Sequence, residues 1–276
     1  MAVKIINKNN SKNVFQKLKK NKCNLCGENK KLCEAHLVPK AFANDLKNNS
    51  KKNFISLKDH HDPKKGHKAK MTKQNLDFDK NILCRECDNE ILNLYESHFI
   101  EKVREYAQSN LRNTNFYNHA RASKIKLRCN TRLFQLALVS ILYKCSISNM
   151  SNIDLGDKYE TMFKKWLKNK KIDNKEKNLC EIYVLGFHKS EQNLNGILFP
   201  NYMGKSKLNH LYKFELLNLS FFIKIGQGKI LYDWPTILDK DDFINIALLE
   251  GNAWKNLHYR EMNKFKQALK KSKLKL

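Results

Sequence analysis

The spacing of apolar residues in the first two thirds of the chain predicts helices. Apolar positions recur every three or four residues over 88–107, 126–148 and 158–170. The first segment is amphipathic and begins near Asp88, with an inner face formed by Ile91, Leu94, Tyr95, His98 and Phe99. The second segment is apolar on nearly every side, which predicts a buried helix. The third has lysines outside and an inner stripe of Met162, Phe163, Trp166 and Leu167.

After the polar stretch 168–178 the pattern changes to the short apolar runs that are typical of strands. These runs cover 180–187, 196–203, 212–226 and 229–237. Gly226 and Gly228 indicate a hairpin between the last two runs. We therefore predict a small antiparallel sheet in this part of the chain.

These patterns together predict an α+β protein with two domains. The first domain covers 1–110, and an accessory α+β domain covers 111–276. Within the accessory domain the helical part spans 111–170, and the sheet with a basic C-terminal helix spans 179–276.

The segment 48–79 is polar and rich in lysine, and we expect a long exposed loop there. Its centre holds a group of side chains that are able to bind a metal, namely Asp59, His60, His61, Asp62 and His67. An exposed loop and a metal site both fit this composition, and the alternative stays open.

The formal net charge of +26 favours a polyanionic partner, because basic side chains release the counterions of nucleic acids on binding. Only seven of the 53 basic residues are arginine, while asparagine and isoleucine are common. An AT-rich coding sequence favours the same composition, so part of the charge reflects mutational bias. Nucleic acid, DNA ahead of RNA, is the expected partner, and a homodimer or a regulatory partner protein stays open.

The chain is expected to be cytoplasmic and not bound to a membrane. The first residues, MAVKIINKNNSKN, lack the apolar core of a signal peptide. The longest apolar run, 133–142, is interrupted by Gln135 and Ser140 and is too short to cross a bilayer.

Two C-x-x-C pairs predict a structural zinc site formed by Cys23, Cys26, Cys84 and Cys87. A two-residue spacer turns both sulfurs of a pair toward one point, and two pairs complete a tetrahedral shell. Fifty-seven residues separate the pairs, so the metal holds an inserted substructure in place. The four other cysteines are interpreted as buried apolar residues or, for Cys33, as a spare ligand.

A histidine and an acid lie close to these cysteines. The run LCEAHLVP has strand character, so Glu34 and His36 share one face and Ala35 points to the other. Asp88 follows the last cysteine at the start of the predicted helix, where an acid also serves as a cap. An imidazole and a carboxylate beside a structural zinc site are what a metal-dependent nuclease uses.

The motifs CNLCG, AHLVPKAF and ILCRECDNEIL, in this order over about residues 20–100, resemble the HNH endonucleases of the zinc-knuckle type. A looser likeness extends through the helical region to about residue 167. The resemblance implies a ββα-metal core, a strand hairpin packed on a helix, in the first domain. It also implies metal-dependent hydrolysis of DNA, with a role in bacterial defence against foreign DNA.

Carried over to this sequence, the resemblance makes His36 the general base and Asp88 the ligand of a catalytic Mg²⁺ or Mn²⁺ ion. Asn89 joins them as a catalytic residue, and Lys40 and Arg85 are expected to contact nucleic acid. Glu34, His61 and Glu96 are expected in the second shell or near the substrate. Phosphodiester hydrolysis needs an activated water and a cation that neutralises the phosphate, which fits these roles.

One position departs from the family pattern, because many members have an aspartate directly before the base histidine and this chain has Ala35. Asn89, Glu96 or an acid of the 59–62 segment is a possible replacement. Glu96 lies about 12 Å along the helix from Asp88, too far for both to bind one ion. If nothing replaces the missing acid, the alternative is an inactive zinc module that binds nucleic acid or a partner protein.

Overall fold

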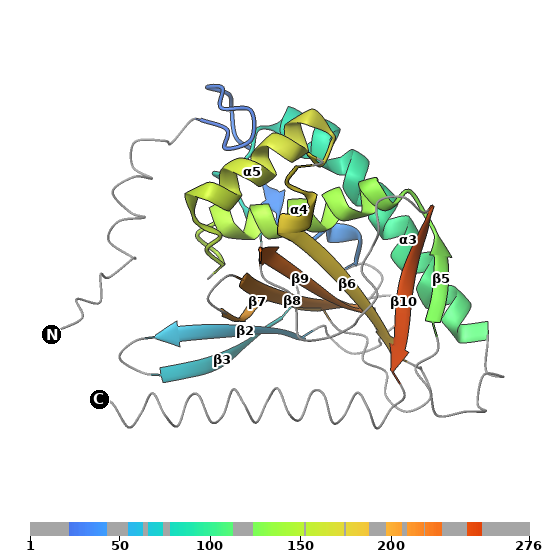
Figure 1. The fold of residues 1–276 in the computed structure, drawn as a ribbon. Helices are drawn as coiled ribbons and strands as arrows, with labels where there is room; N and C mark the ends of the chain where they lie inside the picture. The colour runs from blue at the N-terminus through green and yellow to red at the C-terminus, as the bar shows by residue number, and fades with distance from the viewer. Residues whose placement is uncertain are drawn as a thin grey trace, which may run out of the picture.

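A six-stranded sheet carries three helices on one side (Figure 1). The computed structural model describes residues 22–42, 55–62, 66–73, 78–112, 124–151, 153–173, 175–187, 197–205, 209–217, 219–227 and 242–249. The helices are α3 (Asn93–Arg112), α4 (Thr131–Ile147) and α5 (Gly156–Asn169). The mixture of helix and sheet is consistent with the predicted α+β class.

The sheet has the strand order β5-β10-β6-β9-β8-β7. Its strands are β5 (Lys124–Arg128), β6 (Cys180–Phe187), β7 (Ile197–Lys205), β8 (Asn209–Leu216), β9 (Leu219–Gly226) and β10 (Phe243–Leu249). The pairs are antiparallel except for β10 with β6, which is parallel. The strands that correspond to the predicted runs, β6 to β9, pair antiparallel as expected, and the parallel pair involves β10, which the sequence did not predict and which lies between β5 and β6.

The predicted strand runs have different outcomes. The runs at 180–187 and 196–203 correspond to β6 and β7. The run at 212–226 is not one strand, because it folds back as the β8–β9 hairpin with Leu217 at a positive φ of 45°. The predicted strand at 229–237, the hairpin at Gly228 and the C-terminal helix lie outside the described residues.

The predicted helices are confirmed in place, with shifted starts. The helix expected over 126–148 begins only at Thr131, because 124–128 forms β5 at the edge of the sheet. Asn130 caps it, and its side-chain oxygen accepts a hydrogen bond from the Leu133 amide at 3.1 Å. On α5 the predicted inner stripe is buried as expected. On α3 Leu94 is 46% exposed, so its placement on the inner face was wrong.

Aromatic side chains join the helices to the sheet. The Phe99 ring of α3 lies 4.9 Å from Phe134 of α4 and 5.4 Å from Phe221 of β9, measured between ring centroids. Both contacts are edge-on, the geometry that aromatic pairs prefer. The buried apolar cluster runs without interruption from Cys23 to Ile246, so the cysteine pairs and the sheet share one core.

The polar segment 48–79 contains a hairpin, so the prediction of a long loop was wrong. Strands β2 (Ile55–Asp62) and β3 (Gly66–Lys73) pair antiparallel, with His61 opposite His67. The sequence did not reveal these strands because their apolar alternation is limited to Ile55 and Leu57 and to Ala69 and Met71 within a lysine-rich segment.

Two further strands, β1 and β4, have only two residues each. Strand β1 (Ala35–His36) pairs antiparallel with β4 (Phe78–Asp79). The π-helical segment η1 (Cys87–Leu92) follows and leads directly into α3. In the described part of the chain, no helix has the length and apolarity needed to cross a membrane.

Candidate metal centre and the adjoining site

The four cysteines of the C-x-x-C pairs converge on one point. The sulfurs of Cys23, Cys26, Cys84 and Cys87 all lie within 4.8 Å of one another, and Cys26 Sγ is 4.0 Å from Cys84 Sγ. Zinc–sulfur bonds of about 2.3 Å in a tetrahedron place the sulfurs about 3.8 Å apart. The cluster therefore fits a structural metal site such as zinc, as predicted, and Cys33 is not part of it.

The first cysteine pair has the local geometry of a metal knuckle. Gly27 adopts a φ of 84°, which favours glycine, and its amide donates to the Cys23 carbonyl at 2.9 Å. Backbone amides also point at the sulfurs, since Cys84 N lies 3.3 Å from Cys23 Sγ. Hydrogen bonds from the Cys87 thiol and from backbone amides lower the pKa of Cys23 to about 4. Cys23 therefore favours the thiolate, the form of cysteine that binds metals, whereas its hydrogen bond with Cys87 raises the pKa of the Cys87 thiol.

The knuckle is attached to helix α4. The Tyr143 hydroxyl donates to the Asn24 carbonyl at 3.0 Å, and the Asn24 side chain donates to the Ile82 carbonyl at 2.9 Å. Leu25 between the two cysteines is fully buried. These contacts fix the orientation of the cluster relative to the helices.

His36 projects from the face of β1 opposite to the buried one. It is paired with Phe78, and the two ring centroids are 5.8 Å apart. Burial and the charges of Lys40 and Lys144 lower the pKa of His36 below its usual 6.5, against the opposing charge of Glu34. The imidazole is therefore neutral at pH 7.

The missing family acid at Ala35 is not replaced by its strand partner. Ala35 is paired with Asp79, which lies on the face away from His36 because paired residues share a face. The Asp79 carboxylate is buried and accepts hydrogen bonds from Ser148 Oγ (2.9 Å) and from the amides of Asn149 (3.2 Å) and Asn81 (2.9 Å). Asp79, which the sequence did not single out, ties β4 to the end of α4.

Asp88 lies in the first turn of η1, and its amide donates to the Cys84 carbonyl at 3.0 Å. It is not the N-cap, a position that Glu86 occupies. Burial raises the pKa of Asp88 to about 6; the charge of Lys144 opposes this rise, and Glu96 and Cys23 add to it. These couplings place the carboxylate near the cysteine cluster, Glu96 and Lys144.

The π-helical segment changes the register between Asp88 and Glu96. At 3.6 residues per turn, positions eight apart in a straight α-helix are rotated by about 80°. A π turn takes in one extra residue, so Asp88 and Glu96 are related like positions seven apart, with a rotation of about 20°. Both carboxylates therefore follow the same line along the helix, about 10 Å apart by helical rise.

Glu96 is paired with a buried lysine of α4. Lys144 Nζ lies 2.5 Å from Glu96 Oε1, and the two side chains are 1% and 12% exposed. Ser140 Oγ lies 3.1 Å from the same oxygen. The sequence reasoning missed Lys144, although a lysine inside an otherwise apolar helix was a visible signal.

The other predicted site residues lie at the surface or outside the described side chains. Glu34 is exposed and pairs with Lys80 at 2.8 Å, while Asn89 and Arg85 are exposed on the first helical turn. Lys40 is exposed and acts on His36 through its charge. The side chain of His61, in β2, is not among those described.

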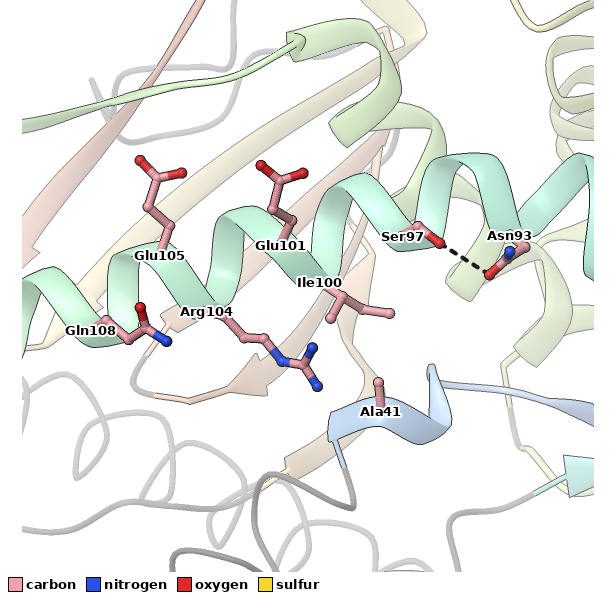
Figure 2. A pocket seen from close by; sticks show the side chains of 8 residues that line it. All are labelled: Ala41, Asn93, Ser97, Ile100, Glu101, Arg104, Glu105 and Gln108. Carbon is pink, nitrogen blue, oxygen red and sulfur yellow. Dashed lines mark hydrogen bonds between the residues drawn. The ribbon is translucent and has the colours of Figure 1, made fainter.

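A shallow groove follows the outer face of α3 and does not include the site (Figure 2). It is lined by Ala41, Asn93, Ser97, Ile100, Glu101, Arg104, Glu105 and Gln108. The carboxylates of Glu101 and Glu105 pair with Lys102 at 3.3 and 2.7 Å. The groove thus carries charges of both signs.

Comparison with family models, with curated proteins and with solved structures gives no match for this chain. The geometry of the residues is therefore the basis of the proposals that follow.

Proposed function

We propose that the protein is a metal-dependent HNH endonuclease that hydrolyses phosphodiester bonds in DNA. The observation that carries the proposal is the four-cysteine cluster, which joins the segment before His36 to the turn that bears Asp88. The short β1–β4 pair followed by a helix has the order of elements that the ββα-metal core requires. A role in defence against foreign DNA follows from the sequence resemblance alone and belongs to the same proposal.

His36 has the properties of a general base. A neutral imidazole accepts a proton from water near pH 7, and the lowered pKa of His36 keeps it in that form. The Phe78 ring beside it restricts its orientation. His36 would thus take the proton of the water that attacks phosphorus.

A carboxylate such as that of Asp88 suits a hard divalent cation. Mg²⁺ and Mn²⁺ prefer oxygen ligands and need only one or two carboxylates from the protein. Asp88 offers one half-buried carboxylate, while Glu96 lies about 10 Å further along the helix, too far to bind the same ion, and would act from the second shell. When bound there, the cation would supply positive charge to the phosphate and the leaving oxygen. Asn89, exposed on the same turn, would complete the set with its amide oxygen.

The second candidate function is a zinc module that binds nucleic acid or a partner protein without cleaving it. Ala35 favours this alternative, because its strand partner Asp79 is committed to Ser148 and Asn149 and faces away from His36. The two functions predict different results with the same reagents.

Plasmid DNA incubated with the protein and Mg²⁺ or Mn²⁺ tests the proposal. The parent should cleave, and His36→Ala and Asp88→Ala should lower the rate by roughly 100-fold or more, as for loss of a general base or a metal ligand. Glu86→Gln removes an exposed carboxylate from the same helical turn and serves as the control that keeps activity. RNA of matched sequence in a parallel reaction reports the substrate preference. DNA binding without cleavage under either ion would favour the zinc module.

A further inference from the structure

Lys144 occupies an unusual place for a charged side chain. It projects from α4, a helix on which thirteen other residues are buried, and it is itself 1% exposed. Its ammonium group is held by Glu96 of α3 at 2.5 Å, and Ser140 lies 3.1 Å from the same carboxylate oxygen. Two elements and three polar side chains thus combine to keep one positive charge inside the protein.

Stability alone does not explain this arrangement. Moving a lysine and a glutamate out of water costs several kcal/mol for each ion, and a buried pair is often no more stabilising than apolar residues of the same size. Most of the buried residues of α4 are apolar, among them Tyr143 and Cys145 on either side of Lys144, so the helix accepts such residues here. A charge kept at that cost points to a use other than packing.

The position of the charge indicates what the use is. One turn beyond Lys144, Ser148 binds Asp79, which is paired with Ala35 next to His36, and Lys144 itself binds Glu96 on the helix that follows Asp88. The charge of Lys144 also opposes protonation of His36 and lowers its pKa. The π-helical register brings Glu96, which holds Lys144, onto the same line of the helix as Asp88. The buried ion pair therefore borders the proposed site on the side of α4.

We propose that Lys144 is a positioning residue of this site, and that Glu96, itself contacted by Ser140, holds the ammonium group where it supplies a fixed positive charge to His36 and to the substrate phosphate. The inference rests on the proposed function for the nature of the substrate, but the Lys144–His36 interaction is independent of it. A fixed charge in a buried place needs no reorganisation when the phosphate arrives, and weak screening by water extends its reach.

The charges that act on His36 define the test. They are Glu34 on the same segment, Lys40 at the following turn and Lys144 from α4. The double variant Lys144→Met with Glu96→Gln removes the buried pair without leaving either charge alone. Lys144→Arg keeps the positive charge at the same position.

A matched control removes a similar pair from the sheet. Lys224 of β9 and Glu181 of β6 lie 2.6 Å apart, and the lysine side chain is 2% exposed. The double variant Lys224→Met with Glu181→Gln therefore makes the same change in charge at a place that does not act on His36.

The first readout is the titration of the His36 ring, followed by NMR in the full-length protein. In Lys144→Met with Glu96→Gln the midpoint should move to higher pH, because a positive neighbour no longer opposes protonation. The midpoint should stay in place in the sheet control, and Lys144→Arg should restore the parental value. An unchanged midpoint in a folded double variant, or an equal movement in the sheet control, would overturn the proposal.

The second readout is the rate of plasmid cleavage at pH 7. The double variant should be slower by about tenfold, less than the roughly 100-fold typical for a group that contacts the reacting atoms. Full activity in a folded double variant would contradict the proposal. If the parent does not cleave DNA at all, the proposed function fails, and the His36 titration still decides the role of Lys144.

Discussion

Replacing Cys84 and Cys87 with serine should remove the metal and release the N-terminal knuckle from the helices. The metal closes a loop between Cys26 and Cys84, which are 58 positions apart. Chain entropy for a loop of that length amounts to about 4 kcal/mol. Structural zinc contributes further binding free energy, about 10–16 kcal/mol in small zinc domains. Each of these two free-energy contributions is larger than that of the hydrogen bonds that Asn24 makes with Ile82 and Tyr143, which supply about 1 kcal/mol each.

The loss should stay local, because a separate aromatic contact holds the helices on the sheet. Phe99, Phe134 and Phe221 make edge-on or tilted contacts that involve no cysteine. Hydrogen exchange should therefore rise over 22–42 and 78–92 in the serine variant and stay slow over the centre of α4.

Elemental analysis of the same protein measures the metal directly. The parent should hold about one zinc per chain, the Cys84/Cys87 serine variant none, and Cys33→Ser the full amount because Cys33 is not in the cluster. Zinc retained by the serine variant, or zinc lost from Cys33→Ser, would refute the assignment of the ligands.

Three further predictions concern stability and pH. Lys144→Met alone should destabilise the protein by roughly 3–5 kcal/mol in urea unfolding, because it leaves the Glu96 charge unpaired, whereas the double variant with Glu96→Gln should be nearly neutral. Phe99→Ala should cost about 3–5 kcal/mol, since the ring is fully buried against Phe134, and a thermal melt measures the loss. As the pH is lowered, cleavage should stay fast through pH 6.5 and fall only at lower pH, where the His36 imidazole and the Asp88 carboxylate gain protons and stop acting as base and metal ligand. A rate that already halves at pH 6.5 or above would contradict that assignment.

The parts of the fold that the sequence predicted are those with a strong local pattern. The inner stripe of α5 repeats at helical spacing and is buried as expected. The two C-x-x-C pairs have fixed spacings that leave few alternatives, and their sulfurs meet. Local periodicity determines which face of an element is apolar, and this holds whatever the element packs against.

The parts that the sequence did not predict depend on partners distant in the chain. Strand β10 is paired in parallel with β6 and antiparallel with β5, and no local signal specifies either neighbour. The β2–β3 hairpin has only a short apolar alternation within a lysine-rich segment, and the pairing of its two strands has no local signal. The π-helical register at Cys87–Leu92 is set by how the helix start packs on the cysteine cluster, which spacing alone does not show.

Helix α4 contacts all three pieces that make up the proposed site. Near its C-terminal end, Tyr143 binds the cysteine knuckle through Asn24, Lys144 binds Glu96, and Ser148 binds Asp79 beside β1. The first two contacts come from adjacent residues and the third follows one turn later, so a single rigid segment positions all three. The cysteine cluster joins the knuckle to the start of the helix. The β1–β4 pair is attached to α4 separately, through the Asp79–Ser148 hydrogen bond. Tyr143, Lys144 and Ser148 thus have a common role. They connect α4, which packs on the sheet, to the elements that carry His36 and Asp88.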